Sequence, residues 1–158
     1  MSIHFPDWVS PALALARQTL ESCHAPDSFD FVGQIDETLP REGYRMQLSP
    51  MERGKQTLRL SGGSDVGLMY GAMDFVNRII PAAEQAHKWM FPYYFVNPFE
   101  TGFAPMDETS SPSVARRGLW TWGHVIYDYR GYLTNMARLK LNELVIWNDF
   151  APLNADEI

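Results

Sequence analysis

Residues 57–73 read TLRLSGGSDVGLMYGAM, and this stretch decides the fold of the first half of the chain. Leu58 and Leu60 alternate with polar neighbours, which is the pattern of a half-buried strand. Ser64 or Asp65 can cap a helix that begins after the glycines. Apolar residues then recur three or four positions apart, namely Val66, Met69, Tyr70, Met73, Val76 and Ile80. The stretch therefore predicts a strand, a tight glycine turn and a helix that Pro81 ends.

The residues before this stretch predict a partner strand and a further helix. Residues 44–48 alternate apolar and polar side chains, and a turn-rich connection over 49–54 predicts an antiparallel hairpin with residues 57–61. Ser10-Pro11 opens a helix with one apolar stripe, which Pro26 ends, and residues 28–32 form a short strand. We therefore expect residues 1–80 to form a small α/β domain, with helices on one face of a small antiparallel sheet.

Residues 81–115 predict a connection between two domains. The segment holds five prolines and ends in the polar run Asp107 to Ser111. A structureless loop of this length inside one compact domain would be unusual. We therefore expect an inter-domain linker that packs its many aromatic side chains across a surface.

Residues 116–158 predict a different architecture. A strand over 119–122, a helix over 128–141 and the apolar run 144–147 form one β-α-β unit, which is typical of parallel sheets. Two strands and one helix cannot bury such a sheet, and a complete (β/α)8 barrel needs ~250 residues. The expected fold class is therefore α+β, in which a small domain is followed by the first β-α-β unit of an incomplete barrel.

Composition excludes several classes of function. The chain has 158 residues and a formal net charge of −6, which argues against binding to nucleic acid or to an anionic membrane surface. No run approaches the ~20 apolar residues of a membrane span, and no secretory signal opens the chain, so we expect a cytoplasmic location. A lone cysteine, Cys23, excludes an intramolecular disulfide and a Cys-rich zinc site. We expect neither a metal nor a cofactor.

Five residues near the ends of the two expected barrel strands are candidates for substrate binding, because active sites of β/α barrels form at the carboxyl ends of the strands. Trp120 and Trp122 can stack on sugar rings or pack in a barrel core, and His124 follows the same strand. Asn148 and Asp149 end the second strand, where they can bond sugar hydroxyls or simply form a turn.

The acidic residues provide no catalytic pair. A glycosidase needs two carboxyl groups ~5–9 Å apart. Asp128 and Asp149 lie near strand ends, but Glu143 begins its strand and belongs to the opposite end. We therefore assign no catalytic residue in these 158 residues. The run over 62–67 lacks both the G-x-G-x-x-G spacing and the lysine of a phosphate loop, which disfavours a nucleotide-binding protein.

Three consecutive segments resemble the small α/β domain that precedes the catalytic barrel in glycoside hydrolase family 20, the β-hexosaminidases. These are Gly43-Tyr44-Arg45-Met46-Gln47-Leu48, Thr57-Leu58-Arg59-Leu60-Ser61-Gly62 and Gly67-Leu68-Met69-Tyr70-Gly71-Ala72-Met73-Asp74-Phe75. Similar domains precede the barrel in α-glucuronidases.

The resemblance continues over the second half. Arg117-Gly118-Leu119 is similar to the start of the first barrel strand, and Met136 to Leu144 is similar to the passage into the second strand. The first strand ends Trp120-Thr121-Trp122-Gly123-His124, where family 20 barrels carry an Asp and an Arg, and the catalytic Asp-Glu pair of that family falls later in the barrel. The resemblance implies a non-catalytic accessory domain and the start of a barrel.

Two functions of different classes follow. In the first, we expect the chain to be the N-terminal portion of a carbohydrate-active hydrolase, inactive alone, whose partners are the rest of the barrel and a carbohydrate. The alternative is a stand-alone module that binds carbohydrate or protein without catalysis. The first predicts self-association, because the apolar strand 144–147 would lack neighbours.

Overall fold

The computed structural model describes residues 1–90, 97–122 and 126–147, without the side chains of 87–90, Trp122 and Trp147. The chain divides into two compact units, Met1–Ser111 and Pro112–Ile158. In the described part of the chain, no helix combines the length and the apolar character that crossing a membrane requires.

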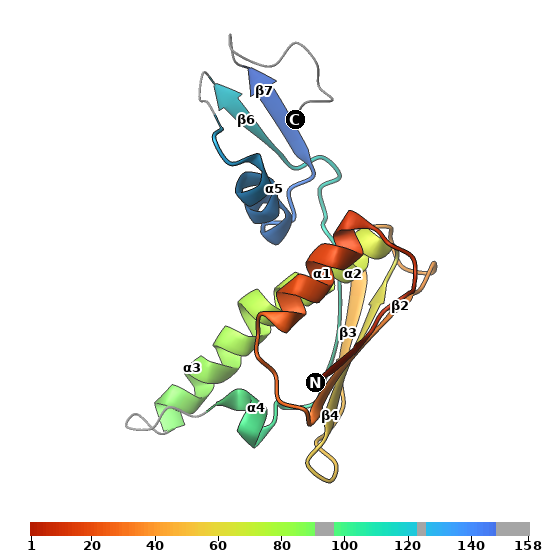
Figure 1. Cartoon of the computed structure of the whole chain (residues 1–158), viewed down its shortest axis with the longest axis vertical. Coiled ribbons are helices and arrows are strands. Elements are labelled where there is room, and N and C mark those ends of the chain that lie inside the picture. Colours follow the sequence, from red (N-terminus) through yellow and green to blue (C-terminus); the bar gives the residue numbers. More distant parts are fainter. Residues whose placement is uncertain (91–96, 123–125, 148–158) are drawn as a thin grey trace. The chain divides into compact units, whose positions relative to one another are not determined.

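The first unit is built on a five-stranded mixed sheet of order β1-β2-β4-β3-β5 (Figure 1). Its strands are β1 (Ser2–His4), β2 (Phe29–Ile35), β3 (Tyr44–Leu48), β4 (Gln56–Gly62) and β5 (Met106–Ser110). The predicted hairpin is confirmed, since β3 pairs antiparallel with β4 and Met46 lies opposite Leu60.

The expectation of an antiparallel sheet is wrong for the other half of the sheet. β4 inserts between β3 and β2 and runs parallel to β2, which in turn runs parallel to β1. The reason is topological: β3 reverses the chain once and β4 reverses it again, so β4 takes the direction of β2. The short edge strand β1 was not predicted.

Two helices cover one face of this sheet, α1 (Pro11–Glu21) and α2 (Asp65–Asp74) (Figure 1). Both begin at the predicted caps. The Ser10 hydroxyl accepts a hydrogen bond from the Leu13 N–H at 3.1 Å, and the Ser64 hydroxyl accepts one from the Gly67 N–H at 3.5 Å. Each cap satisfies a backbone donor that the first helical turn leaves open.

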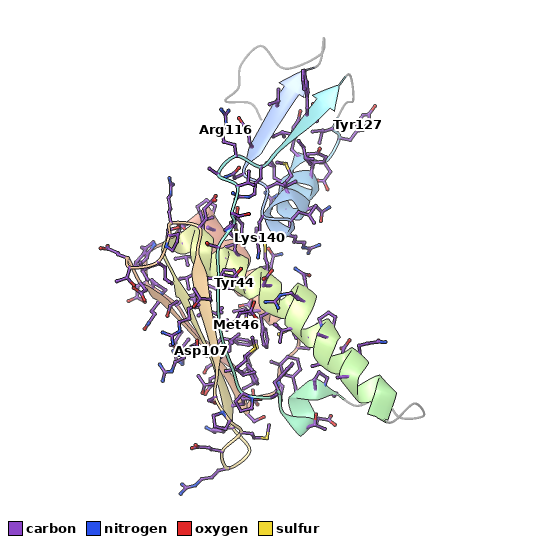
Figure 2. The ribbon with its side chains drawn as sticks, turned by 180° about the vertical axis from the view of Figure 1, so that it is seen from behind. Tyr44, Met46, Asp107, Arg116, Tyr127 and Lys140 are labelled. Atoms are coloured by element: carbon purple, nitrogen blue, oxygen red, sulfur yellow. The ribbon has the colours of Figure 1, made fainter. Side chains whose placement is uncertain are left out.

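The core of the first unit lies between this sheet face and the helices. Tyr44 and Met46 of β3 are directed towards the helices, and the Tyr44 hydroxyl bonds the Asp74 carboxylate of α2 (Figure 2). Burial of each large apolar side chain stabilises the fold by about 1.5–3 kcal/mol. The side chains that are less than 2% exposed include Phe29, Phe31, Leu20, Met46, Leu58, Leu60, Leu68, Met73 and Phe75.

Pro81 does not end the helix that follows the glycine turn, contrary to the sequence prediction. The chain continues from α2 through a π-helical turn over Phe75–Ile79 into α3 (Ile80–Met90). In that wide turn the Ile80 N–H bonds the carbonyl of Phe75, five residues back. The wider turn changes the hydrogen-bonding register just before the proline, and Pro81 then stands in the first turn of α3, where its missing N–H costs little.

The structure also differs from the linker expected over 81–115. This region holds α3, the short helix α4 (Pro98–Thr101) and β5, which pairs antiparallel with β3. Phe99 and Phe103 are buried against Phe29, with ring centroids 5.3 and 6.0 Å away. β5 has the sequence MDETS, so it shows no apolar alternation, and main-chain pairing with β3 rather than side-chain pattern places it in the sheet.

The second unit contains the predicted β-α-β arrangement. β6 (Gly118–Trp122) and β7 (Glu143–Trp147) pair in parallel, and α5 (Tyr129–Arg138) connects them. Its described residues form a two-stranded sheet and close no barrel.

Candidate functional site

The structure places one of the five predicted site side chains. Trp120 lies in the middle of β6 and its side chain is 58% exposed. Trp122 ends the same strand, but its side chain is outside the described part of the chain. His124, Asn148 and Asp149 also fall outside the described residues.

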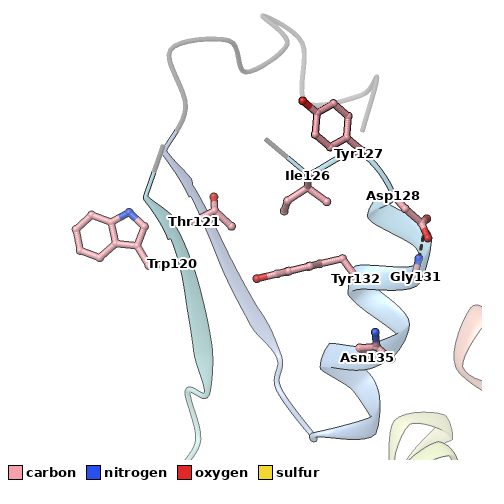
Figure 3. A pocket seen from close by; sticks show the side chains of 8 residues that line it. All are labelled: Trp120, Thr121, Ile126, Tyr127, Asp128, Gly131, Tyr132 and Asn135. Atoms are coloured by element: carbon pink, nitrogen blue, oxygen red, sulfur yellow. Dashed lines mark hydrogen bonds between the residues drawn. The ribbon is translucent and has the colours of Figure 1, made fainter. Parts of the chain in front are cut away.

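Strand alternation divides the second unit into two faces. Trp120 lies opposite Val145 of β7, and both side chains are exposed, at 58% and 45%. Figure 3 shows Trp120 directed away from α5. Thr121 points to the other face and is only 5% exposed, and its hydroxyl donates to the Val145 carbonyl at 3.3 Å. The helix therefore covers one face of the sheet and leaves the Trp120 face open.

A hollow of about 500 Å³ lies between β6 and α5 (Figure 3). Its volume falls in the range of ligand pockets, roughly 300–1,000 Å³. Tyr132 projects from α5 towards the strands, and Tyr127 is 95% exposed at the rim. Aromatic faces beside hydroxyl, amide and carboxylate groups are the chemistry that contacts sugar rings. The lining residues are Trp120, Thr121, Ile126, Tyr127, Asp128, Gly131, Tyr132 and Asn135.

The acidic group in this hollow has a structural task. Asp128 caps α5, and its Oδ1 accepts a hydrogen bond from the Gly131 N–H at 2.9 Å. A Cβ at position 131 would collide with the same carboxylate, so glycine is the residue that lets this cap close. Asp128 therefore caps the first turn of the helix.

The only other acid of the described second unit lies at the opposite end of the strands. Glu143 begins β7 and pairs with the guanidinium of Arg116, whose hydrogen bond lowers the pKa of that carboxyl below its usual value. No second carboxylate approaches Asp128 in the described second unit. Across the described residues, no three His, Cys, Asp or Glu side chains gather as metal ligands would.

Hydrogen bonds from side chains join the amino ends of β6 and β7. The Arg117 N–H donates to the Asn142 side-chain oxygen at 2.9 Å, and the Asn142 amide donates to the Ala115 carbonyl at 2.8 Å. The Arg117 guanidinium also donates to the Lys140 carbonyl at 2.6 Å. These contacts hold the two strands together at their amino ends.

Of the residues that line the hollow, only Trp120 was among the predicted site residues; those that were missed include Tyr127, Tyr132 and Asn135. Tyr132 and Asn135 stand three residues apart on one face of α5. Asp128, placed just before them, was the signal that could have drawn attention to that face.

The glycine-rich start of α2 is closed by the protein's own backbone. The Gly63 N–H donates to the Gly43 carbonyl at 2.9 Å, and the Ser64 hydroxyl donates to the Arg41 carbonyl at 2.6 Å. A Cβ at Gly67 would collide with the Gly43 carbonyl oxygen. The glycines therefore allow the 40–43 loop to lie against the helix, in the tight turn that the sequence predicts.

The comparisons with known proteins show a likeness in fold but no family. The chain matches no protein-family model and no curated protein. Among solved structures, 22 chains match. One is a GH138 enzyme that targets pectin rhamnogalacturonan II, with 18% sequence identity and a TM-score of 0.55. The match covers 93% of this chain and 18% of that chain, so this chain corresponds in fold to a small part of a glycoside hydrolase.

Proposed function

We propose that this chain is the N-terminal, non-catalytic portion of a carbohydrate-active glycoside hydrolase, in which it supports the catalytic barrel. The observation that carries the proposal is the exposure of apolar side chains in the second unit. Of the ten large hydrophobic side chains exposed in the described chain, seven belong to this short unit. They are Val114, Leu119, Trp120, Tyr127, Leu133, Leu139 and Val145.

The second unit also buries very little. Among its described residues, only Met136 and Thr121 are buried. A two-stranded sheet with one helix cannot offset the entropy of ordering its chain, and strands that are apolar on both faces belong to sheets with further neighbours. Additional strands beside β6 and β7 would supply the missing burial.

The fold likeness supports a carbohydrate-active role. The GH138 neighbour is a glycoside hydrolase, and its described target is a pectin polysaccharide. The sequence segments over 43–75 and 117–144 add the resemblance to family 20 and to α-glucuronidases, which is the finer assignment that we propose. In such a protein, O-glycosyl hydrolysis depends on acids outside these 158 residues.

In this assignment the five predicted residues contact the carbohydrate from the first two strands of the barrel. Trp120 and Trp122 provide stacking surfaces, and His124, Asn148 and Asp149 bond hydroxyls near the strand ends. Tyr127 extends this set, because it follows β6 and is almost fully exposed.

Hydrogen exchange of the 158-residue chain tests the supporting role. We expect amides of β6 and β7 to exchange rapidly and those of β2, β3 and β4 to be protected, because only the first unit has a closed core. Equal protection in both units, in a monomeric chain, would instead favour the stand-alone binding module.

The reading frame beyond the codon for Ile158 tests the catalytic context. If the frame continues and encodes alternating strands and helices, the whole protein would be expressed and its activity on glycosides measured. In that protein Trp120→Ala should lower activity, whereas Trp8→Ala, which removes a similarly exposed tryptophan of the first unit at 54%, should not. A stop codon directly after Ile158 would contradict the proposal.

A further inference from the structure

The open face of the five-stranded sheet carries a polar hollow in the first unit, on the side away from α1 and α2. The hollow measures about 390 Å³ and lies across the ends of three strands. In the pairing register, Gln47 of β3 stands between Arg59 of β4 and Asp107 of β5, so the three side chains form a row. The remaining lining residues are Leu48, Ser49, Thr57 and Met106.

The negative charge of Asp107 in this row is already balanced by the positive charge of Arg45. The Asp107 carboxylate accepts hydrogen bonds from Arg45 Nε at 2.7 Å and from its terminal nitrogen at 2.6 Å, and a third from the Gln47 amide at 2.9 Å. These bonds hold the pKa of Asp107 at about 2, so the carboxylate is ionised and bound at neutral pH. Asp107 and Arg45 together contribute no net charge to the hollow.

The positive charge of Arg59 is not compensated. Within the described part of the chain, the Arg59 guanidinium forms neither an ion pair nor a hydrogen bond, although it lines the hollow. Beside it, the Gln47 amide donates to Asp107, which leaves the Gln47 side-chain carbonyl available as an acceptor. The Thr57 hydroxyl also lines the hollow and can donate or accept.

We propose that this hollow binds a carboxylate-bearing sugar. The planar Arg59 fork binds the carboxylate in a bidentate manner, and Gln47 and Thr57 bond the ring hydroxyls. The volume exceeds what a simple carboxylate ion fills and falls within the range for small ligands. Because the chain has a net charge of −6, attraction of an anion must come from this local cation, and added salt should weaken it. The site is independent of the second unit and of the catalytic context proposed above.

A nuclear magnetic resonance titration of the 158-residue chain tests this proposal with three probes: trigalacturonate, neutral galactotriose and acetate. We expect trigalacturonate to shift the amides of residues 47, 57, 59 and 107 in a saturable way, and the other two probes to shift them far less. Equal binding of neutral galactotriose would show that binding does not need the carboxylate and would overturn the proposal. Equal binding of acetate would reduce the site to a simple anion contact and would overturn the sugar assignment.

Matched variants assign the contact to Arg59. Arg59→Ala should weaken trigalacturonate binding about tenfold or more, because one charge-assisted bidentate contact is lost. Arg59→Lys should recover only part of it, since an ammonium lacks the fork. Arg41→Ala removes the same charge from an exposed loop residue of the same unit and should leave the affinity within about twofold. Equal losses in Arg59→Ala and Arg41→Ala, or no saturable shift in the parent chain, would overturn the proposal.

Discussion

At the scale of single residues, Gln56 shows how one buried polar side chain joins distant segments. Its amide nitrogen donates to the carbonyls of Ser49 and Phe103, both at 2.8 Å, and its oxygen accepts from the Phe103 N–H at 3.0 Å. Gln56 is only 1% exposed, so water cannot reach its amide group, and these bonds satisfy its buried polar atoms instead. This clamp holds the chain at Phe103 against the start of β4, 47 residues earlier.

Gln56→Leu should therefore lower the free energy of unfolding by about 2–3 kcal/mol, because the substitution leaves buried backbone groups of Ser49 and Phe103 without partners. Urea unfolding measures the loss. Gln18→Leu, on the exposed side of α1, is the matched control and should change stability by less than about 0.5 kcal/mol. A similar stability for both variants would show that the clamp contributes little.

At the scale of elements, β5 is an edge strand that side-chain ion pairs reinforce on both faces. Asp107 binds Arg45 on the open face, and Glu108 binds Arg78 at 2.7 Å on the helix side. The Arg78 guanidinium also lies 3.4 Å from Asp74, which accepts the Tyr44 hydroxyl bond. Main-chain pairing with β3 and these ion pairs compensate for the absence of apolar side chains in the strand.

The Asp107 interaction predicts a specific pH dependence. Its pKa is lowered from 3.8 to about 2, chiefly by the hydrogen bond from Arg45. A lowered folded-state pKa means that the stabilisation is complete above the unfolded value near 3.8 and is lost as the pH falls through about 2. Urea unfolding between pH 5 and pH 2 should therefore show a smaller decline for Asp107→Asn than for the parent chain.

Asp7→Asn is the control for this profile, since Asp7 forms no ion pair among the described residues. The stability of Asp7→Asn should decline with falling pH in parallel with that of the parent chain. Parallel profiles for all three proteins would show that the Arg45–Asp107 pair does not contribute to stability, as for many exposed ion pairs.

At the scale of the whole molecule, the two units differ in how complete they are. The first has a closed core between sheet and helices, with an aromatic cluster whose ring centroids lie 5.0 to 6.0 Å apart. Among the described residues of the second, seven large apolar side chains are exposed to solvent. Exposed apolar surface with open strand edges promotes association between copies.

Residues 1–111 alone should therefore be a monomer that unfolds cooperatively, with a melting temperature within about 4 °C of that of the same unit in the full chain. The full chain should self-associate and bind a hydrophobic dye, and removal of residues 112–158 should abolish both. Sedimentation and dye fluorescence measure these properties. A monomeric full chain that binds no dye would contradict the incomplete nature of the second unit.

The elements that could be predicted are those with a local physical cause. The alternation of Leu58 and Leu60, and the caps at Ser10 and Ser64, identified the hairpin and both helix starts, because side-chain period and capping depend on near neighbours. The prediction that Pro81 ends the helix was wrong, because the π-helical turn before it depends on packing. In the candidate site, strand position identified Trp120, whereas Tyr132 and Asn135 required the helix orientation.

The amino-acid sequence by itself determined the α+β class, the β-α-β unit of residues 118–147 and the glycine turn before α2, since each follows from contacts between residues close in the chain. The tertiary structure alone decided that β4 lies parallel to β2, that β5 completes the sheet and that Arg59, Gln47 and Asp107 form a row. These features depend on main-chain hydrogen bonds between distant segments, which any side chain except proline permits and which therefore leave no pattern in the sequence.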